Sequence, residues 1–305
     1  MSSVPRLSTA VVLTRGEPSR TEVLVVRRNP KLRFFGGYWA FPGGTIEPQD
    51  HEGDPDGDPT HRRCAARELF EETGVLLSPF AEQVEAAERE ELRGILLAEA
   101  VDSRWRAGLD RHAGALGRFR PFARVTTPPF APVRYRTRFV HAELPAGEAL
   151  DIRHGELVDG RFVHPGTFLD EWARGGLLVA PPVLHLLELL RDRAVDDFLE
   201  HAAQVCAANE AGALHAIRNT PGIRMAPLRT PTIPPATTTN AYVVGEQELF
   251  VVDPAPWDED ERARLVAFLA RLEAEGRRVA GVLVTHHHHD HVGAIETVAR
   301  RFRVP

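Results

Sequence analysis

The stretch Arg67–Val75 reads RELFEETGV, and it follows the turn Phe41–Gly44, which reads FPGG. Glu68, Glu71 and Glu72 are spaced i, i+3 and i+4, so they share one face of a predicted helix. Three carboxylates this close repel one another unless solvent screens them or a cation binds them. A solvated acidic face is the simplest interpretation of such a group. The surrounding sequence decides between that interpretation and a metal site.

The helix that carries these glutamates has clear boundaries. Asp58 can cap its start, Pro59 suits the first helical position, and Gly74 can end it. Upstream, residues 8–15 and 21–28 are rich in Val and Leu and are separated by a Gly-Glu-Pro turn. That pattern predicts two strands before the helix.

The rest of the chain continues the alternation of strands and helices. Composition shifts over 207–237, where Pro and Thr are frequent, and this segment is predicted to be a linker and lead-in. Helices are expected over about 82–108, 181–205, 258–275 and 294–302, and strands over 118–127, 133–144, 157–165, 241–245, 248–256 and 279–285.

Composition bounds the class of protein. A chain of 305 residues with 43% hydrophobic content is long enough for two domains with buried cores. The net charge of −6 provides no general field for nucleic acid or an anionic membrane. Cys64 and Cys206 imply no disulfide framework, and we see no signal peptide or membrane-spanning run. We therefore expect a cytoplasmic protein.

The pattern from Gly44 to Val75 resembles the signature of the Nudix hydrolases: G, five residues, E, seven residues, R-E-U-x-E-E-x-G-U, where U is aliphatic. The half that begins at Arg67 fits at every fixed position. In the front half, Asp50 stands at the glutamate position, and sixteen residues instead of seven separate it from Arg67. Most of them form an acidic loop, which costs little entropy to lengthen. The sequence leaves open whether the short Asp50 side chain reaches Arg67.

The resemblance implies a role for each fixed residue of this signature, which is called the Nudix box below. Glu68, Glu71 and Glu72 would be the ligands of Mg²⁺ or Mn²⁺, and such hard oxygen donors suit these cations. Arg67 would be an internal salt-bridge partner that positions the helix. Arg67, Glu71 and Glu72 form the expected catalytic set, with Glu72 as the preferred general base. Glu156 is a second candidate for the base, and an ordinary charge at a strand edge is its alternative.

A second signature lies upstream of the box. Arg28, Arg33, Gly37 and the FPGG run resemble the extra motif of Nudix coenzyme A diphosphatases, except at Asn29, where that motif has Ser or Ala. The arginines are expected to clamp a phosphate. Surface arginines beside core aromatics are the alternative. The expected substrate-binding residues are Arg28, Arg33, Gly43 and Gly44.

Near the end, LVTHHHHDHVGA contains His286, His288, Asp290 and His291 in the pattern H-x-H-x-D-H. It resembles the metallo-β-lactamase fold, specifically the glyoxalase II-like or ribonuclease-like hydrolases. The resemblance implies these four residues as zinc ligands, because imidazole and carboxylate groups suit Zn²⁺. A purification tag is disfavoured because the run is internal, and a solvated histidine loop is the other alternative.

The same resemblance implies a further His, a bridging Asp and a last His downstream. Fourteen residues follow His291, and they contain neither His nor Asp. We therefore expect a fragment of a longer protein, with two or three loosely held strands after about residue 225. Zinc is expected only if this domain is completed.

Together the patterns predict an α+β protein. A Nudix α/β/α sandwich with helical insertions is expected over 1–206, a linker and lead-in over 207–237, and an incomplete metallo-β-lactamase αββα domain over 238–305. The expected function is Mg²⁺- or Mn²⁺-dependent cleavage of a nucleoside diphosphate derivative, such as coenzyme A or acyl-coenzyme A. The alternative places the main activity, thioester hydrolysis or nuclease action, in the second domain, with the Nudix domain as a binding module.

Overall fold

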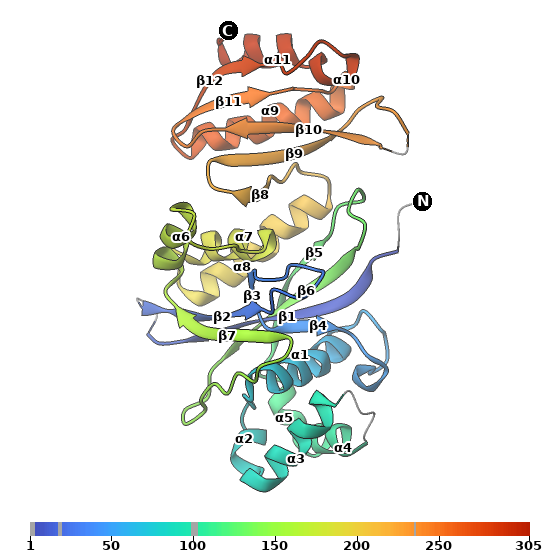
Figure 1. The fold of residues 1–305 in the computed structure, drawn as a ribbon, viewed down its shortest axis with the longest axis vertical. Helices are drawn as coiled ribbons and strands as arrows, with labels where there is room; N and C mark the ends of the chain where they lie inside the picture. The colour runs from blue at the N-terminus through green and yellow to red at the C-terminus, as the bar shows by residue number, and fades with distance from the viewer. Residues whose placement is uncertain (1–3, 18–19, 99–102, 235) are drawn as a thin grey trace. The chain divides into compact units, whose positions relative to one another are not determined.

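The computed structural model describes residues 4–17, 20–98, 103–234 and 236–305. These residues form two compact units (Figure 1). The first contains the chain up to Trp172 and Leu177–Ala207, and the second contains Ala208–Pro305 with Ala173–Gly176. Among the described residues, no helix combines the length and the apolar character needed to cross a membrane.

The described part of the first unit is built on a seven-stranded mixed sheet in the order β3-β2-β1-β6-β5, with β4 beside β1 and β7 beside β2. β1 and β6 run parallel, from Arg6 opposite Tyr135 to Thr14 opposite Glu143. The strands are β1 (Arg6–Arg15), β2 (Glu22–Arg28), β3 (Trp39–Ala40), β4 (Gly43–Thr45), β5 (Arg120–Thr126), β6 (Tyr135–Glu143) and β7 (Leu157–Val163).

Helices cover both faces of this sheet (Figure 1). Val11 and Leu13 of β1 pack in the core on the side of α1 (Asp58–Thr73), and Val12 packs in the opposite core with α6 (Pro165–Ala173), α7 (Pro181–Leu190) and α8 (Val195–Glu210). This α/β/α arrangement confirms the predicted fold class. The helical insertions are α2 (Phe80–Gln83), α3 (Ala86–Leu97), α4 (Ser103–Arg111) and α5 (Ala113–Leu116).

The helix boundaries differ from the predictions in three places. The predicted helix over 82–108 is divided between α2, α3 and α4, and residues 99–102 lie outside the described residues. The predicted helix over 181–205 is interrupted by a turn between α7 and α8. Gly57, and not Asp58, is the N-cap of α1, whereas Gly74 ends the helix with φ 73°. A glycine suits that left-handed conformation because it has no Cβ.

In the second unit, the described residues form a five-stranded sheet in the order β12-β11-β10-β9-β8. Two of these strands, β8 and β9, lie inside the segment predicted as a linker and lead-in, and the other three follow it. One face packs on α9 (Glu259–Ala274) and α11 (Ile295–Phe302), and the other exposes Phe250 and Val244. The strands are β8 (Ile217–Thr220), β9 (Ile223–Arg229), β10 (Thr238–Val244), β11 (Glu248–Val252) and β12 (Arg278–Leu283).

Candidate functional site

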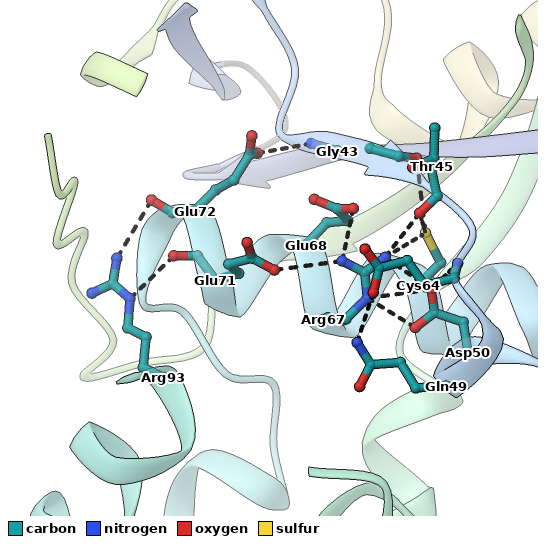
Figure 2. Close-up of polar contacts among 12 residues, drawn as sticks. Gly43, Thr45, Gln49, Asp50, Cys64, Arg67, Glu68, Glu71, Glu72 and Arg93 are labelled. Carbon is teal, nitrogen blue, oxygen red and sulfur yellow. Dashed lines mark hydrogen bonds and ion pairs between the residues drawn. The ribbon is translucent and has the colours of Figure 1, made fainter. Parts of the chain in front are cut away.

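The C-terminal half of α1 places its glutamates close to β4 (Figure 2). The Gly43 N–H donates to Glu72 Oε2 at 2.9 Å. Gly44 lies against Glu68 so closely that a Cβ there would overlap the carboxylate, and a Cβ on Gly43, at φ 151°, would overlap the carbonyl of Thr9. Gly44 therefore allows β4 to approach the glutamate face, and Gly43 allows β4 to lie close to β1.

Arg67 is the centre of a buried ion-pair network. Its Nε donates to Asp50 Oδ1 at 3.0 Å and its Nη2 to Asp50 Oδ2 at 2.8 Å. The same guanidinium lies 2.9 Å from Glu68 and 3.4 Å from Glu71, and donates to the Thr45 carbonyl at 2.9 Å. Burial alone lowers the pKa of Arg67, but the hydrogen bonds that it donates to Asp50 and the nearby carboxylates raise that pKa above its ordinary value. Arg67 is therefore held charged.

Asp50 reaches Arg67 because the preceding turn brings it inward. Pro48–Asp50 forms a short 3-10 helix with Glu47 as its N-cap residue, and the Glu47 N–H donates to Asp50 Oδ2 at 3.0 Å. Asp50 is 1% exposed, which places the carboxylate next to the guanidinium. The question left open by the sequence is thereby answered: the shorter side chain makes a bidentate pair with Arg67.

The three glutamates lie in a setting that disfavours their charged forms. Burial raises the pKa of Glu68 to about 8 and that of Glu71 to about 7. Burial, followed by the charges of Glu68 and Glu156, raises the pKa of Glu72 well above its ordinary value. A divalent cation with oxygen ligands would compensate this cost, so the donor chemistry fits Mg²⁺ or Mn²⁺.

The carboxylates are grouped but do not form a preformed cage. Among the described residues, no three His, Cys, Asp or Glu side chains have the arrangement of a metal site. Glu72 is directed to the Gly43 amide, and Glu68 is paired with Arg67. Two of the three glutamates are therefore held by protein groups at this face.

The structure adds Glu47 and Arg93, which the sequence did not single out, and it brings the second candidate base, Glu156, to the same face. The charges of Glu47 and Glu156 both act on Glu71, so these two carboxylates border the glutamate face. Arg93 of α3 donates to the carbonyl of Glu71 at 3.2 Å and to that of Glu72 at 3.4 Å. A cation at a helix C-terminus stabilises the last turn. Arg93 lies 21 residues beyond Glu72, and no local pattern links the two.

Of the two predicted phosphate-binding arginines, Arg28 is connected to the site and Arg33 is not. Arg28 Nη2 lies 2.7 Å from Glu156 Oε1, and its Nε is buried without a hydrogen-bond partner among the described residues. Arg33 is exposed on the loop between β2 and β3. Arg28 is therefore oriented by protein contacts, and Arg33 is accessible to a ligand.

Aromatic side chains on this loop and on the strands beside it fall into two groups. Phe34 is 38% exposed, and its ring centroid lies 5.2 Å from that of Tyr135 and 4.6 Å from that of Phe35. Trp39, in contrast, is buried and packs edge-on against Phe168. The core interpretation of these aromatics holds for Trp39, whereas Phe34 and Tyr135 form a partly exposed aromatic surface.

In the second unit, the predicted histidines gather at the C-terminal end of β12. The ring centroid of His286 lies 4.0 Å from that of His291 and 4.6 Å from that of His288. Asp253 Oδ2 lies 3.0 Å from His291 Nδ1, so this carboxylate orients the imidazole ring. Asp290 is less close, at 3.9 Å from His291 Nε2. Asp253 was not singled out by the sequence, although it directly follows β11.

His289 lies apart from this group, in agreement with its position between the predicted ligands. Its ring stacks on Trp257 at 4.4 Å between centroids, and the Trp257 indole N–H donates to its carbonyl at 2.6 Å.

Comparison with known proteins gives two separate matches along the chain. Residues 4–137 match the family model of the NUDIX domain, and residues 234–305 match that of the metallo-beta-lactamase superfamily. A crystal structure of a NUDIX hydrolase from Alicyclobacillus acidocaldarius is 27% identical, with a TM-score of 0.54, over 65% of this chain and 97% of that one. Both resemblances noted in the sequence are thereby confirmed.

Two further similarities are more limited. A hydroxyacylglutathione hydrolase from Chromohalobacter salexigens is 55% identical over 31 residues, which is 10% of this chain and 12% of the length of that curated relative. The NUDIX domain of Shewanella oneidensis NrtR, in a structure complexed with ADP ribose, is 16% identical with a TM-score of 0.38, over 61% of this chain and 86% of that one.

Proposed function

We propose that this chain, in which a Nudix hydrolase domain is joined to a metallo-beta-lactamase-superfamily segment, hydrolyses the diphosphate bond of a nucleotide derivative. The observation that carries the proposal is the glutamate face of α1, anchored by Arg67 and approached by Gly43 and Gly44. A diphosphate bond is an acid anhydride, so the enzyme belongs to the class of hydrolases that act on such bonds.

The residues have distinct tasks in this reaction. Glu68, Glu71 and Glu72 would hold Mg²⁺ or Mn²⁺, which when bound supplies charge neutralisation of the diphosphate and an acidified water. Glu72 accepts the proton as water oxygen attacks phosphorus, and the bridging phosphorus–oxygen bond breaks to release two phosphorylated products. The Gly43 N–H holds the Glu72 carboxylate against β4. Arg67 positions the helix and does not contact the substrate.

Metal-dependent turnover tests this proposal directly. Release of phosphorylated products from a panel of nucleoside diphosphate derivatives should require Mg²⁺ or Mn²⁺. Glu72→Gln should lower kcat by at least about 10²-fold, the low end for a general base. Glu82→Gln is the matched control, because Glu82 is an exposed glutamate on α2. Near-normal turnover by Glu72→Gln would remove the assignment of the base.

For the substrate, we propose coenzyme A or an acyl derivative. The support is the position of Arg28 beside Glu156, the accessibility of Arg33, and the exposed ring of Phe34 on the same loop. Cleavage would give adenosine 3′,5′-bisphosphate and a phosphopantetheine product. Binding of a remote phosphate stabilises the ground and transition states alike, so Arg33→Ala should raise KM more than it lowers kcat.

The control for the substrate test is Lys31→Ala, which removes another exposed cation from the same loop. It should leave KM for coenzyme A unchanged. Equal cleavage of ADP-ribose and coenzyme A, together with no effect of Arg33→Ala, would contradict the coenzyme A proposal and leave the diphosphatase proposal intact.

A second candidate function is favoured by the histidines of the second unit. His286, His288 and His291 lie ring to ring, and Asp253 orients His291 in the way that carboxylates orient metal-binding histidines. We propose zinc-dependent thioester hydrolysis or nuclease action for a completed domain, with residues 238–305 as its first part and the Nudix domain as a binding module.

The two isolated cysteines favour a reducing compartment such as the cytoplasm.

A further inference from the structure

Asn29 joins the end of β2 to the turn that precedes β7. Its backbone N–H donates to the Glu156 carbonyl at 2.8 Å, and its side-chain Nδ2 donates to the Gly155 carbonyl at 2.8 Å. Its side-chain Oδ1 accepts from the Lys31 N–H at 3.1 Å. Both ends of the side-chain amide are therefore used, and the turn is held at two successive carbonyls.

The pairing of β2 with β7 is irregular at the same point. Arg27 lies opposite Asp159, but the next residue, Arg28, lies opposite Leu157, so β7 has one extra residue between them. A bulge of this kind changes the direction of nearby side chains and is frequent next to active sites. Glu156 lies directly before the bulge, so the turn that Asn29 holds, and not a regular strand register, sets its direction.

The carboxylate of Glu156 is held at one oxygen. Arg28 Nη2 lies 2.7 Å from Glu156 Oε1, whereas Glu156 Oε2 has no hydrogen-bond or ion-pair partner in the described part of the chain. The Glu156 side chain is 55% exposed and that of Arg28 is 19% exposed. One carboxylate oxygen is therefore accessible to a ligand while the other is fixed by a largely buried guanidinium.

The pair of Arg28 and Glu156 borders the glutamate face of α1. Burial and the charge of Glu68 are the main causes that raise the pKa of Glu72; the charge of Glu156 raises it further, and that of Arg28 lowers it. Both members of the pair therefore act on Glu72 through space. Glu68 and Glu72 are each 9% exposed, so Glu156 adds an accessible carboxylate at the edge of a buried group.

We propose that Asn29 is a positioning residue for Glu156, whose exposed carboxylate supplies one further oxygen ligand to the divalent cation at the glutamate face. The inference rests on the hydrolysis proposed above and concerns the ligands of its cation. Groups that orient a metal ligand change metal affinity by about 10–100-fold. Asn29 is also the position at which the upstream signature has Ser or Ala, and alanine has no donor for the Gly155 carbonyl, so the contact is particular to this chain.

Titration of the full chain with Mn²⁺ in the absence of substrate, with free Mn²⁺ measured by electron paramagnetic resonance, tests this inference. Glu156→Gln and Asn29→Ala should each raise the Kd for Mn²⁺ about tenfold, the low end for loss of a group that orients a ligand. The double variant should bind no more weakly than Glu156→Gln alone, because Asn29 acts through Glu156. A purely structural role of Asn29 would give no such dependence.

Gln204→Ala is the matched control, because it removes an exposed side-chain amide that bonds to Glu200 on α8, and it should leave the Kd unchanged. Equal Mn²⁺ affinity of wild type and Glu156→Gln overturns the inference, as does an effect of Asn29→Ala that persists in full in the double variant. Glu156 is exposed, so Glu156→Gln remains decisive even if Asn29→Ala proves unstable.

Glu72→Gln distinguishes this inference from the proposed function. Weaker Mn²⁺ binding by Glu72→Gln, together with wild-type binding by Glu156→Gln, overturns the role of Asn29 and Glu156 and leaves the hydrolysis proposal intact. Absence of Mn²⁺ binding and of metal-dependent turnover in the wild type overturns both.

Discussion

Asp50 and Arg67 form a bidentate ion pair, with Nη2 to Oδ2 at 2.8 Å and Nε to Oδ1 at 3.0 Å, and both side chains are almost fully buried. The pair joins the end of the β4 turn to the middle of α1 across the inserted loop. The insertion between them therefore changes the length of the connection without separating the two ends of the box.

Loss of one partner of this pair should be costly. Asp50→Asn leaves the Arg67 charge buried with weaker compensation, and breaking a buried pair costs about 3–5 kcal/mol of unfolding free energy. Urea denaturation would measure the change. The control is Glu22→Gln, which breaks the exposed pair with Arg15 and should cost less than about 1 kcal/mol. Equal urea midpoints for the two variants would show that the buried pair contributes no more to stability than the exposed pair does.

Gly44→Ala should impair catalysis more than stability. The added Cβ would occupy the space of the Glu68 carboxylate, which is the end of a flexible side chain and can move. We expect a loss of at least about tenfold in kcat, because small displacements of a catalytic group are expensive. Gly94→Ala is the control: nothing lies near its Cβ position, and alanine should stabilise α3 by up to about 1 kcal/mol. Unchanged kcat in Gly44→Ala would argue against a role for Glu68.

His141 should make the first unit sensitive to acid. Burial, and next the charge of Arg120, lowers the pKa of His141 from 6.5 to about 4. The unfolded chain therefore binds the proton more readily than the folded chain, so stability is full above pH 6.5 and falls as the pH drops toward 4. The free energy of unfolding should fall by about 3 kcal/mol over this range. The melting temperatures of wild type and His141→Gln should approach one another as the pH falls from 7 to 4. A difference in melting temperature that stays constant over this range would contradict the assignment to His141.

The second unit should not retain a pair of zinc ions. Its histidine group provides part of a ligand set, and strong zinc affinity requires complete coordination. Metal analysis of the 305-residue chain after dialysis should therefore find less than two equivalents of zinc. The informative comparison is with His288→Ala, and His287→Ala is the control at a position between the predicted ligands. Two equivalents that survive dialysis and disappear only in His288→Ala would falsify the prediction.

Much of the first unit could be predicted because its signals are local. The apolar runs of β1 and β2, the Pro59 start and Gly74 end of α1, and the spacing of the glutamates all lie within short windows of sequence. Each reflects a backbone or periodicity rule that acts over a few residues. The resemblance to the Nudix signature predicted that Arg67 has an internal salt-bridge partner. The structure shows that Asp50 pairs with it through both carboxylate oxygens.

The remaining contacts of the first unit could not be predicted because the residues that they join are distant in sequence. Arg93 binds carbonyls at the end of α1, Glu156 pairs with Arg28 across 128 residues, and Asp56 meets Arg136 across 80. No periodicity connects such positions, and only the packing of the sheet brings them together. The strands inside the predicted linker and lead-in were not predicted for another reason: β8 has only four residues, and β9 contains a proline in a segment where Pro and Thr are frequent.

The parallel pairing of β1 with β6 has a consequence for how the nascent chain folds. One edge of β1 is completed only by residues 135–143, although β1 itself is finished at Arg15. At about 5–20 residues per second, that edge leaves the ribosome roughly 6–26 seconds before its partner is made. During this interval its amide and carbonyl groups are open to other strands. Synthesis at reduced rate should therefore increase aggregation of this chain, and holdase chaperones should be needed most before residue 143 emerges.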